Sequence, residues 1–205
     1  MKKSLVVVMA AAIGVTAFLS GRAVSGQLEE KQEPKEPKKA KMPEIPTPPT
    51  QLKALTAFVG DWRSTFEHLP AMFGEPGTGT GEFHCEWVLD NWFVMGKGSS
   101  TGSFGTHKSM WMVTYDPKMQ TYRSFAFDNY GTCSTATLTH DPETNTWLQT
   151  SDGVDFQSGK PAEIKSMMRF VGKDKLEWEW HQKAEGETEF TLMMKGVDTR
   201  VPATP

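Results

Sequence analysis

The stretch SMWMVTYDPKMQTYRSFAFD, residues 109–128, decides the fold class, because it has the pattern of two strands joined by a tight turn. Its two halves, 109–115 and 121–128, are rich in β-branched and aromatic residues. Between them stands Asp116-Pro117, and this dipeptide starts turns because Asp hydrogen-bonds to the backbone ahead of it while Pro fixes its own φ. The stretch therefore predicts an antiparallel hairpin.

The same pattern repeats on both sides of this hairpin. Asp141-Pro142 divides another pair of runs, Gly172 and Gly186 mark two further turns, and apolar and polar residues alternate within 82–89. The expected strands are 62–69, 80–89, 92–100, 109–115, 121–128, 133–140, 146–151, 164–171, 176–182 and 188–195. About ten consecutive strands without a long helix fit a barrel or a sandwich. We favour an all-β, antiparallel up-and-down barrel, since closure removes exposed edge strands.

A short helix is expected immediately before the first strand. Leu52, Leu55, Phe58 and Val59 fall at helical spacing over about two turns. Gly60 then ends the stripe and is expected to adopt the left-handed conformation of a helix C-terminus.

The first 25 residues have the layout of a secretory signal peptide. Lys2 and Lys3 precede an apolar run over 5–19, and the small residues at 23–25 offer a cleavage site. The apolar run is short for a membrane-spanning helix, which needs about 20 residues. We expect an exported protein, periplasmic or secreted, and the alternative is an uncleaved segment that anchors the chain to a membrane.

The remaining organisation follows from composition. Residues 26–50 are rich in Pro, Lys and Glu and poor in apolar residues, which predicts a disordered linker that acts as a spacer. We expect the barrel domain over 51–200 and a short tail over 201–205.

Charge and cysteine content exclude several classes of protein. The chain has 205 residues, with Lys+Arg 22 against Asp+Glu 25. Eight basic and five acidic residues lie within 1–49, so the folded part is net acidic, which argues against binding of nucleic acid. Two Cys cannot form a four-Cys zinc site. Cys85 and Cys133 could instead form one disulfide in an oxidising compartment, or remain free.

An ordered series of motifs carries a family resemblance. Residues 52–62, LKALTAFVGDW, resemble the opening of the calycin superfamily, where a short helix leads into a Gly-x-Trp strand. Residues 81–89, 91–93, 115–117 and 127–129 then follow in the order found in the DUF1579 family of uncharacterised bacterial secreted proteins. The resemblance covers roughly 52–197 and implies a lipocalin-like β-barrel. It implies no defined activity.

The related nitrobindins resemble this chain in strand number and in the Gly-x-Trp motif. They hold haem through a histidine near the C-terminal end of the barrel, and His181 is the candidate by position. Arg63, Ser64 and Thr65 stand where nitrobindins have glycines after the Trp. We therefore expect no cofactor, and haem at His181 is the alternative.

Candidate site residues fall into an apolar and a polar group. Aromatic side chains suit a cavity for an apolar ligand, and we select Trp87, Trp111, Phe127 and Trp180. The polar candidates share strand faces and could serve proton transfer: Glu82, His84, Glu86 and His181. No local zinc motif or nucleophile motif joins them, so we assign no catalytic or metal-binding residue.

The leading functional hypothesis is a non-enzymatic exported barrel that binds a small apolar molecule. One alternative is an envelope interaction module whose barrel is filled by its own side chains. Another is a small hydrolase or isomerase that uses the Glu and His residues of a barrel strand. The sequence points to no nucleic-acid partner, and it predicts no oligomeric state.

Overall fold

The computed structural model describes residues 46–155 and 157–202. A 3-10 helix, η1 (Thr50–Phe58), precedes ten strands, and a short helix, α1 (Pro70–Phe73), follows the first of them. The strands are β1 (Gly60–His68), β2 (Gly77–Val88), β3 (Phe93–Gly102), β4 (Gly105–Asp116), β5 (Thr121–Asp128), β6 (Cys133–Asp141), β7 (Thr146–Val154), β8 (Pro161–Phe170), β9 (Lys175–Ala184) and β10 (Thr191–Arg200). The expected signal segment (1–25), residues 26–45 of the expected linker and residues 203–205 lie outside the described residues.

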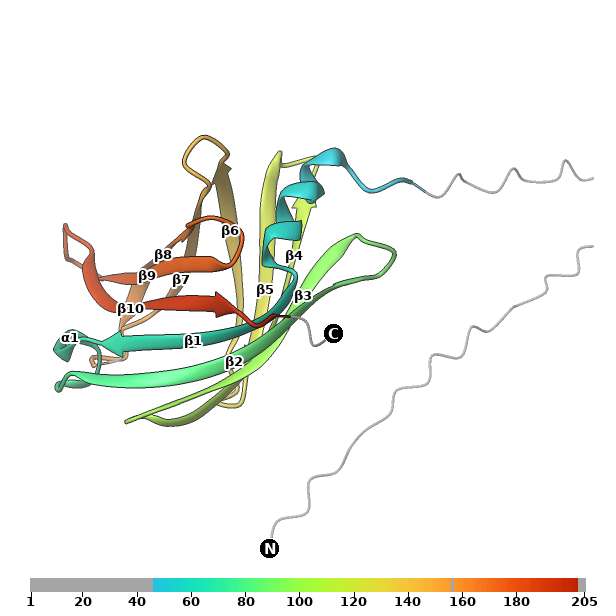
Figure 1. Ribbon diagram of the computed structural model, residues 1–205. Helices are drawn as coiled ribbons and strands as arrows, with labels where there is room; N and C mark the ends of the chain where they lie inside the picture. Colours follow the sequence, from blue (N-terminus) through green and yellow to red (C-terminus); the bar gives the residue numbers. More distant parts are fainter. Residues whose placement is uncertain (1–45, 156, 203–205) are drawn as a thin grey trace, which may run out of the picture. The chain divides into compact units, whose positions relative to one another are not determined.

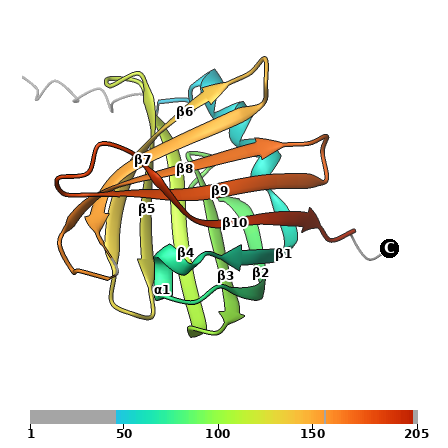
Figure 2. The same cartoon turned by 90° about the vertical axis from the view of Figure 1, so that its left-hand side faces the viewer.

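The strands form one closed antiparallel barrel (Figure 1). Each strand pairs with the one before it, and β10 pairs with β1 to close the sheet (Figure 2). This arrangement confirms the predicted up-and-down barrel of ten strands. The hairpin that decided the prediction is β4–β5, and its turn has the expected chemistry, because Asp116 Oδ1 accepts hydrogen bonds from the N–H groups of Lys118 (2.9 Å) and Met119 (3.1 Å).

Both helices differ in detail from the sequence expectation. η1 is a 3-10 helix that ends at Phe58, and Val59 is already extended. Gly60 has φ 130° and is the first residue of β1, where an added Cβ would collide with the guanidinium of Arg200. Gly60 therefore does not end a helix. Its lack of a side chain allows Arg200 of β10 to approach closely. The helix α1, which has Pro70 in its first turn, was not expected from the sequence.

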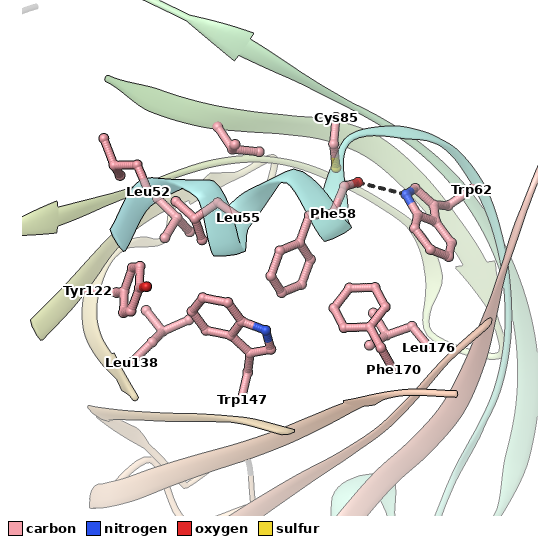
Figure 3. Close-up of a cluster of buried hydrophobic side chains, with 12 residues drawn as sticks. Leu52, Leu55, Phe58, Trp62, Cys85, Tyr122, Leu138, Trp147, Phe170 and Leu176 are labelled. Atoms are coloured by element: carbon pink, nitrogen blue, oxygen red, sulfur yellow. Dashed lines mark hydrogen bonds between the residues drawn. The ribbon is translucent and has the colours of Figure 1, made fainter. Parts of the chain in front are cut away.

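The hydrophobic core lies where η1 packs inside one end of the barrel (Figure 3). Leu52, Leu55 and Phe58 are buried along the helix, so the spacing that predicted a helix also marks its buried face. Phe58 makes edge-to-face contacts with Trp147 and Phe170, with ring centroids 5.3 and 5.0 Å apart. These contacts close this end of the barrel with side chains.

Two residues hold the C-terminal end of η1 against the barrel. The indole Nε1 of Trp62 donates a hydrogen bond of 2.8 Å to the carbonyl of Phe58 (Figure 3). Arg200 donates from Nη2 to the carbonyl of Ala57 (2.9 Å) and from Nη1 to the carbonyl of Val59. Its guanidinium also lies 4.1 Å from the centroid of the Trp62 ring. The Trp of the Gly-x-Trp motif thus joins the helix to the first and last strands.

Candidate ligand-binding cavity

The register of the strands leaves small side chains on part of the interior wall. Directly opposed residues of neighbouring strands share a face, and alternate residues of a strand point inward. Trp62 is buried and faces inward, so the residues paired with it and with its alternate neighbours identify the inward face of β2, β3, β4 and β5 in turn. The small inward residues are Ser64, Gly81, Gly98, Ser100, Ser109 and Ser124. Because these side chains are short, the barrel is not filled away from η1.

A cavity of about 950 Å³ occupies this part of the interior. Its floor includes Phe58, whose ring belongs to the core beneath η1. Aromatic side chains on several strands form the walls: Phe66, Phe83, Trp111, Trp178 and Trp180. A mostly apolar cavity with a few polar groups is typical of small-molecule sites, which measure about 300–1,000 Å³.

The rim of the cavity lies at the end of β1 opposite η1, where Figure 1 shows α1. Phe73 of α1 and Tyr130 of the β5–β6 loop line the cavity and are 43% and 61% exposed. Phe104 from the β3–β4 turn lies between them in sequence and packs against Phe73, with ring centroids 5.8 Å apart. The rim is therefore aromatic and open to solvent.

Close approach of two tryptophans to glycines shapes the walls. Trp111 lies opposite Gly96, and Trp178 lies opposite Gly196. At either glycine an added Cβ would overlap the indole ring of the opposing Trp. The absence of a side chain at these two positions allows each ring to lie flat against the neighbouring strand.

One buried carboxyl group, Asp198, lies in the cavity wall on β10. Asp198 is 5% exposed and stands between Ser64 of β1 and Leu176 of β9. Trp178 Nε1 donates to its Oδ1 over 2.9 Å, and the Ser64 hydroxyl also donates to the carboxylate. Burial raises the pKa of Asp198, while these two hydrogen bonds oppose the rise.

A second carboxyl group, Asp128, lies nearer the rim. Burial alone would raise the pKa of Asp128, but hydrogen bonds hold it below its ordinary value. Its Oδ1 accepts from the N–H groups of Tyr130 (2.9 Å) and Thr132 (3.0 Å), and His107 Nε2 lies 3.4 Å from Oδ2. His107 also stacks on Tyr130, with centroids 5.4 Å apart. These contacts use most of the accepting capacity of Asp128 within the protein.

The structure separates the four predicted aromatic cavity residues. Trp111 and Trp180 line the cavity. Trp87 packs against the core cluster and is not part of the lining. Phe127 faces outward, because its neighbour Ala126 lines the cavity and alternate residues face opposite ways; the ring is 42% exposed.

The polar candidates lie on the outer face of the barrel. Glu82 is near Arg63, with 3.4 Å between Oε1 and Nε, and His84 Nδ1 lies 2.7 Å from Asp61 Oδ1. Glu86 shares their strand face and is exposed. The hydrolase or isomerase hypothesis predicted inward carboxylates beside a histidine in a concave site, either within this strand or with His181 of β9. The carboxylates and His84 instead face outward, and β1 and β10 separate their strand from β9.

His181 does not fit the haem alternative. Its Nε2 lies 3.0 Å from Oε2 of Glu179, two residues along the same outward face of β9. The inward neighbours on that strand are Trp180 and Gln182, which pair with Met194 and Thr191. No group of His, Cys, Asp and Glu suited to a metal ion occurs within residues 46–155 and 157–202.

The two cysteines are free thiols in different environments. Cys85 is buried on the inward face of β2, and Cys133 is exposed at the start of β6. Burial raises the pKa of Cys85 to about 12, and the nearby Asp198 adds to the rise. Cys85 is therefore an inert core residue.

Most polar residues of the cavity were not among the residues predicted from the sequence. Asp198 lies beyond 195, where the last strand was expected to end. Alternation within the first strand could have identified Ser64, because Trp62 and Phe66 flank it at intervals of two. Asp128 shares the face of Ala126, and only the strand register shows that this face points inward.

Comparisons with known proteins give a family and a fold. Residues 47–200 match the family described as "Protein of unknown function (DUF1579)". The crystal structure of Rv2717c from M. tuberculosis superposes with a TM-score of 0.58 and 12% identity, covering 76% of this chain and 100% of that one. The S-type phycobiliprotein lyase CPES from Guillardia theta gives 0.51 and 11%, covering 74% and 93%. No curated protein matches.

The family match confirms the resemblance to DUF1579, and the two solved structures share the β-barrel fold of this chain. At such low identity the two solved structures show the fold alone. Among the residues that the structure describes, no helix is long and apolar enough to cross a membrane.

Proposed function

We propose, from the premise that this chain belongs to the DUF1579 family of proteins of unknown function, that its barrel binds a small, largely apolar molecule. The observation that carries the proposal is the cavity of about 950 Å³ between the η1 core and the open rim. Such a volume would fit an organic molecule of the size that ligand pockets usually hold.

The distribution of side-chain size supports this function over a filled interaction module. Large residues such as Leu55, Phe58 and Trp147 fill the η1 end, where they are fully or almost fully buried. Away from that end, each of the five successive strands β1–β5 has at least one serine or glycine among its inward residues, between the aromatic side chains of the walls. A barrel that served only as a scaffold would gain stability from larger apolar residues at these positions.

The polar outer grooves are weaker candidates for the ligand site. A depression over β1, β9 and β10 contains Glu67 and Lys195, whose carboxylate and ammonium groups pair at 2.7 Å. A groove lined by charged side chains that pair with one another offers an apolar ligand little favourable contact. The interior, by contrast, offers aromatic walls shielded from water.

A fluorescence titration of the full chain tests the proposal. N-phenyl-1-naphthylamine is uncharged at neutral pH and becomes fluorescent in apolar surroundings, so binding in the cavity should raise its emission with saturation. Ser109→Phe adds a ring inside the cavity, and the matched control Thr135→Phe adds one to the exposed face of β6. We expect binding to weaken at least about tenfold in the first variant and to persist in the second. Equal binding by both variants would contradict an interior site.

We also propose that the protein is exported, on the strength of Lys2, Lys3, the apolar run over 5–19 and the small residues at 23–25. Mass measurement of the chain recovered from cell fractions tests this directly. A mature chain beginning at Gly26 outside the cytoplasm is the expected result. A full-length chain confined to the cytoplasm would refute it.

A further inference from the structure

The charged groups of the cavity are of one sign. Among the described residues that line it are the carboxyl groups of Asp128 and Asp198, together with one imidazole, His107, and no Lys or Arg. The remaining acidic lining positions, Glu82 and Glu179, direct their side chains to the outer face, where they contact Arg63 and His181. A ligand in the interior therefore meets carboxylates without a fixed cation.

The arginine closest in sequence to Asp198 does not compensate it. Arg200 donates hydrogen bonds to the carbonyls of Ala57 and Val59 and stacks on Trp62, so its charge is committed to the end of η1. The ion pairs among the described residues do not include Asp198. Asp198 is 5% exposed and has only neutral donors, so its ionised form is electrostatically costly, and burial raises its pKa for this reason. A cation bound beside it would relieve this cost and favour the carboxylate.

The surroundings of Asp198 suit an organic cation. Trp178 donates its indole N–H to Oδ1, and its ring lies against Phe66 with centroids 6.2 Å apart. A carboxylate has about four acceptor positions, so the bonds from Trp178 and Ser64 leave capacity for a further donor. Aromatic faces next to a carboxylate attract ammonium groups through both the ring quadrupole and the charge. Cys85 on β2 is the titratable neighbour, and it is neutral because burial and Asp198 both raise its pKa.

We propose that the cavity selects amphipathic amines: molecules whose apolar body occupies the aromatic walls and whose ammonium group binds the carboxylate of Asp198. The same arrangement discriminates against fatty acids and other carboxylates, because a buried carboxylate ligand would face Asp198 without a counter-charge. This inference rests on the proposed function and specifies the class of its ligand.

A matched series of competitors tests the selectivity without any change to the protein. Decylamine, decanol and decanoate have the same chain and differ in the charge of the head group. Each is used below micelle-forming concentrations to displace N-phenyl-1-naphthylamine from the full chain at neutral pH. We expect decylamine to displace the probe at a concentration at least about tenfold lower than decanoate does, with decanol between them. Equal displacement by the amine and the carboxylate would overturn the inference.

Asp198→Asn then identifies the residue responsible. The variant should lose most of the preference for decylamine over decanoate while still binding the neutral probe. Asp61→Asn is the matched control, since Asp61 is an exposed carboxylate paired with His84 on the outer face. A preference that survives Asp198→Asn, or that disappears equally in the control, would contradict the role of Asp198.

The two failures can be told apart. If the neutral probe does not bind the wild-type chain, the proposed function itself fails. If the probe binds and head-group charge has no effect, only the selectivity fails. Should Asp198→Asn not fold, the wild-type competition series still decides the inference.

Discussion

Replacing Trp62 with Phe removes the contacts that join η1 to the barrel. The change deletes the indole N–H that donates to the carbonyl of Phe58 over 2.8 Å. It also reduces the aromatic surface under the guanidinium of Arg200, which lies 4.1 Å from the ring centroid. Trp62 is 1% exposed, so water cannot readily replace either contact.

The expected cost is the sum of three terms. Leaving the carbonyl of Phe58 without its donor costs about 1–2 kcal/mol. The smaller ring loses about 1 kcal/mol of packing, and the weakened cation–π contact about 0.5 kcal/mol. We therefore expect a loss of about 3 kcal/mol in the free energy of unfolding, which lowers the Tm of a domain of this size by about 6–12 °C.

Urea denaturation followed by far-ultraviolet circular dichroism measures this loss without relying on tryptophan fluorescence. Trp87→Phe, a change of the same kind in a residue that packs against the same core, is the control and should cost about 1 kcal/mol. A double-mutant cycle with Arg200→Met should give a coupling energy of at least about 0.5 kcal/mol. A Trp62→Phe loss within about 0.5 kcal/mol of zero, or strict additivity with Arg200→Met, would refute this explanation of the Gly-x-Trp motif.

Three further predictions concern other parts of the barrel. Gly96→Val should displace the ring of Trp111, lower the free energy of unfolding by about 1–3 kcal/mol and weaken binding of the naphthylamine probe. A variant with unchanged near-ultraviolet circular dichroism and unchanged probe affinity would contradict this close contact. An aromatic disulfide reagent at pH 8 should modify Cys133 in the folded chain and Cys85 only in urea, because Cys85 is buried and its pKa is raised to about 12. Rapid reaction of both thiols in the folded chain would contradict the burial of Cys85. Hydrogen bonds and charge from Lys175 and Arg169 lower the pKa of Glu177 to about 2, so the stability that Glu177 contributes is present above its ordinary pKa of 4.5 and is lost as the pH falls through about 2. The stability deficit of Glu177→Gln in denaturation experiments should therefore shrink as the pH falls from 4.5 to about 2. A deficit independent of pH would count against the pairing.

The strands were predictable because each local signal agreed with the global fold. Turn chemistry at Asp116-Pro117 and at Asp141-Pro142 is satisfied by short-range hydrogen bonds, so it does not depend on the rest of the barrel. The period-2 pattern likewise survives over 82–86, where Phe83 and Cys85 are half-buried and buried while Glu82, His84 and Glu86 are exposed. It fails at Leu89, which lies after the end of β2 and is 64% exposed. The sequence predicted a helix near 50–58 but not its type, because the side-chain spacings of 3-10 and α-helices are similar over two turns.

The cavity was harder to predict, because it depends on which strand faces point inward. Phe127 was selected for its aromatic ring, but the strand register places Ala126 on the inward face and Phe127 on the outward face. The wall is shaped as much by the absence of side chains as by their presence, as at Gly96 opposite Trp111. Asp198 becomes a candidate only when β10 is known to continue to Arg200 and to pair with β1.

A native mass spectrum of the protein, purified without organic solvent from the cells that produce it, tests the central claim most directly. We predict that part of the wild-type protein retains the mass of one small molecule, and that Thr135→Phe retains it as well. Ser109→Phe, with a ring inside the cavity, should appear as the bare chain. A wild-type spectrum of the bare chain, indistinguishable from that of Ser109→Phe, would contradict the account of the interior as a ligand site.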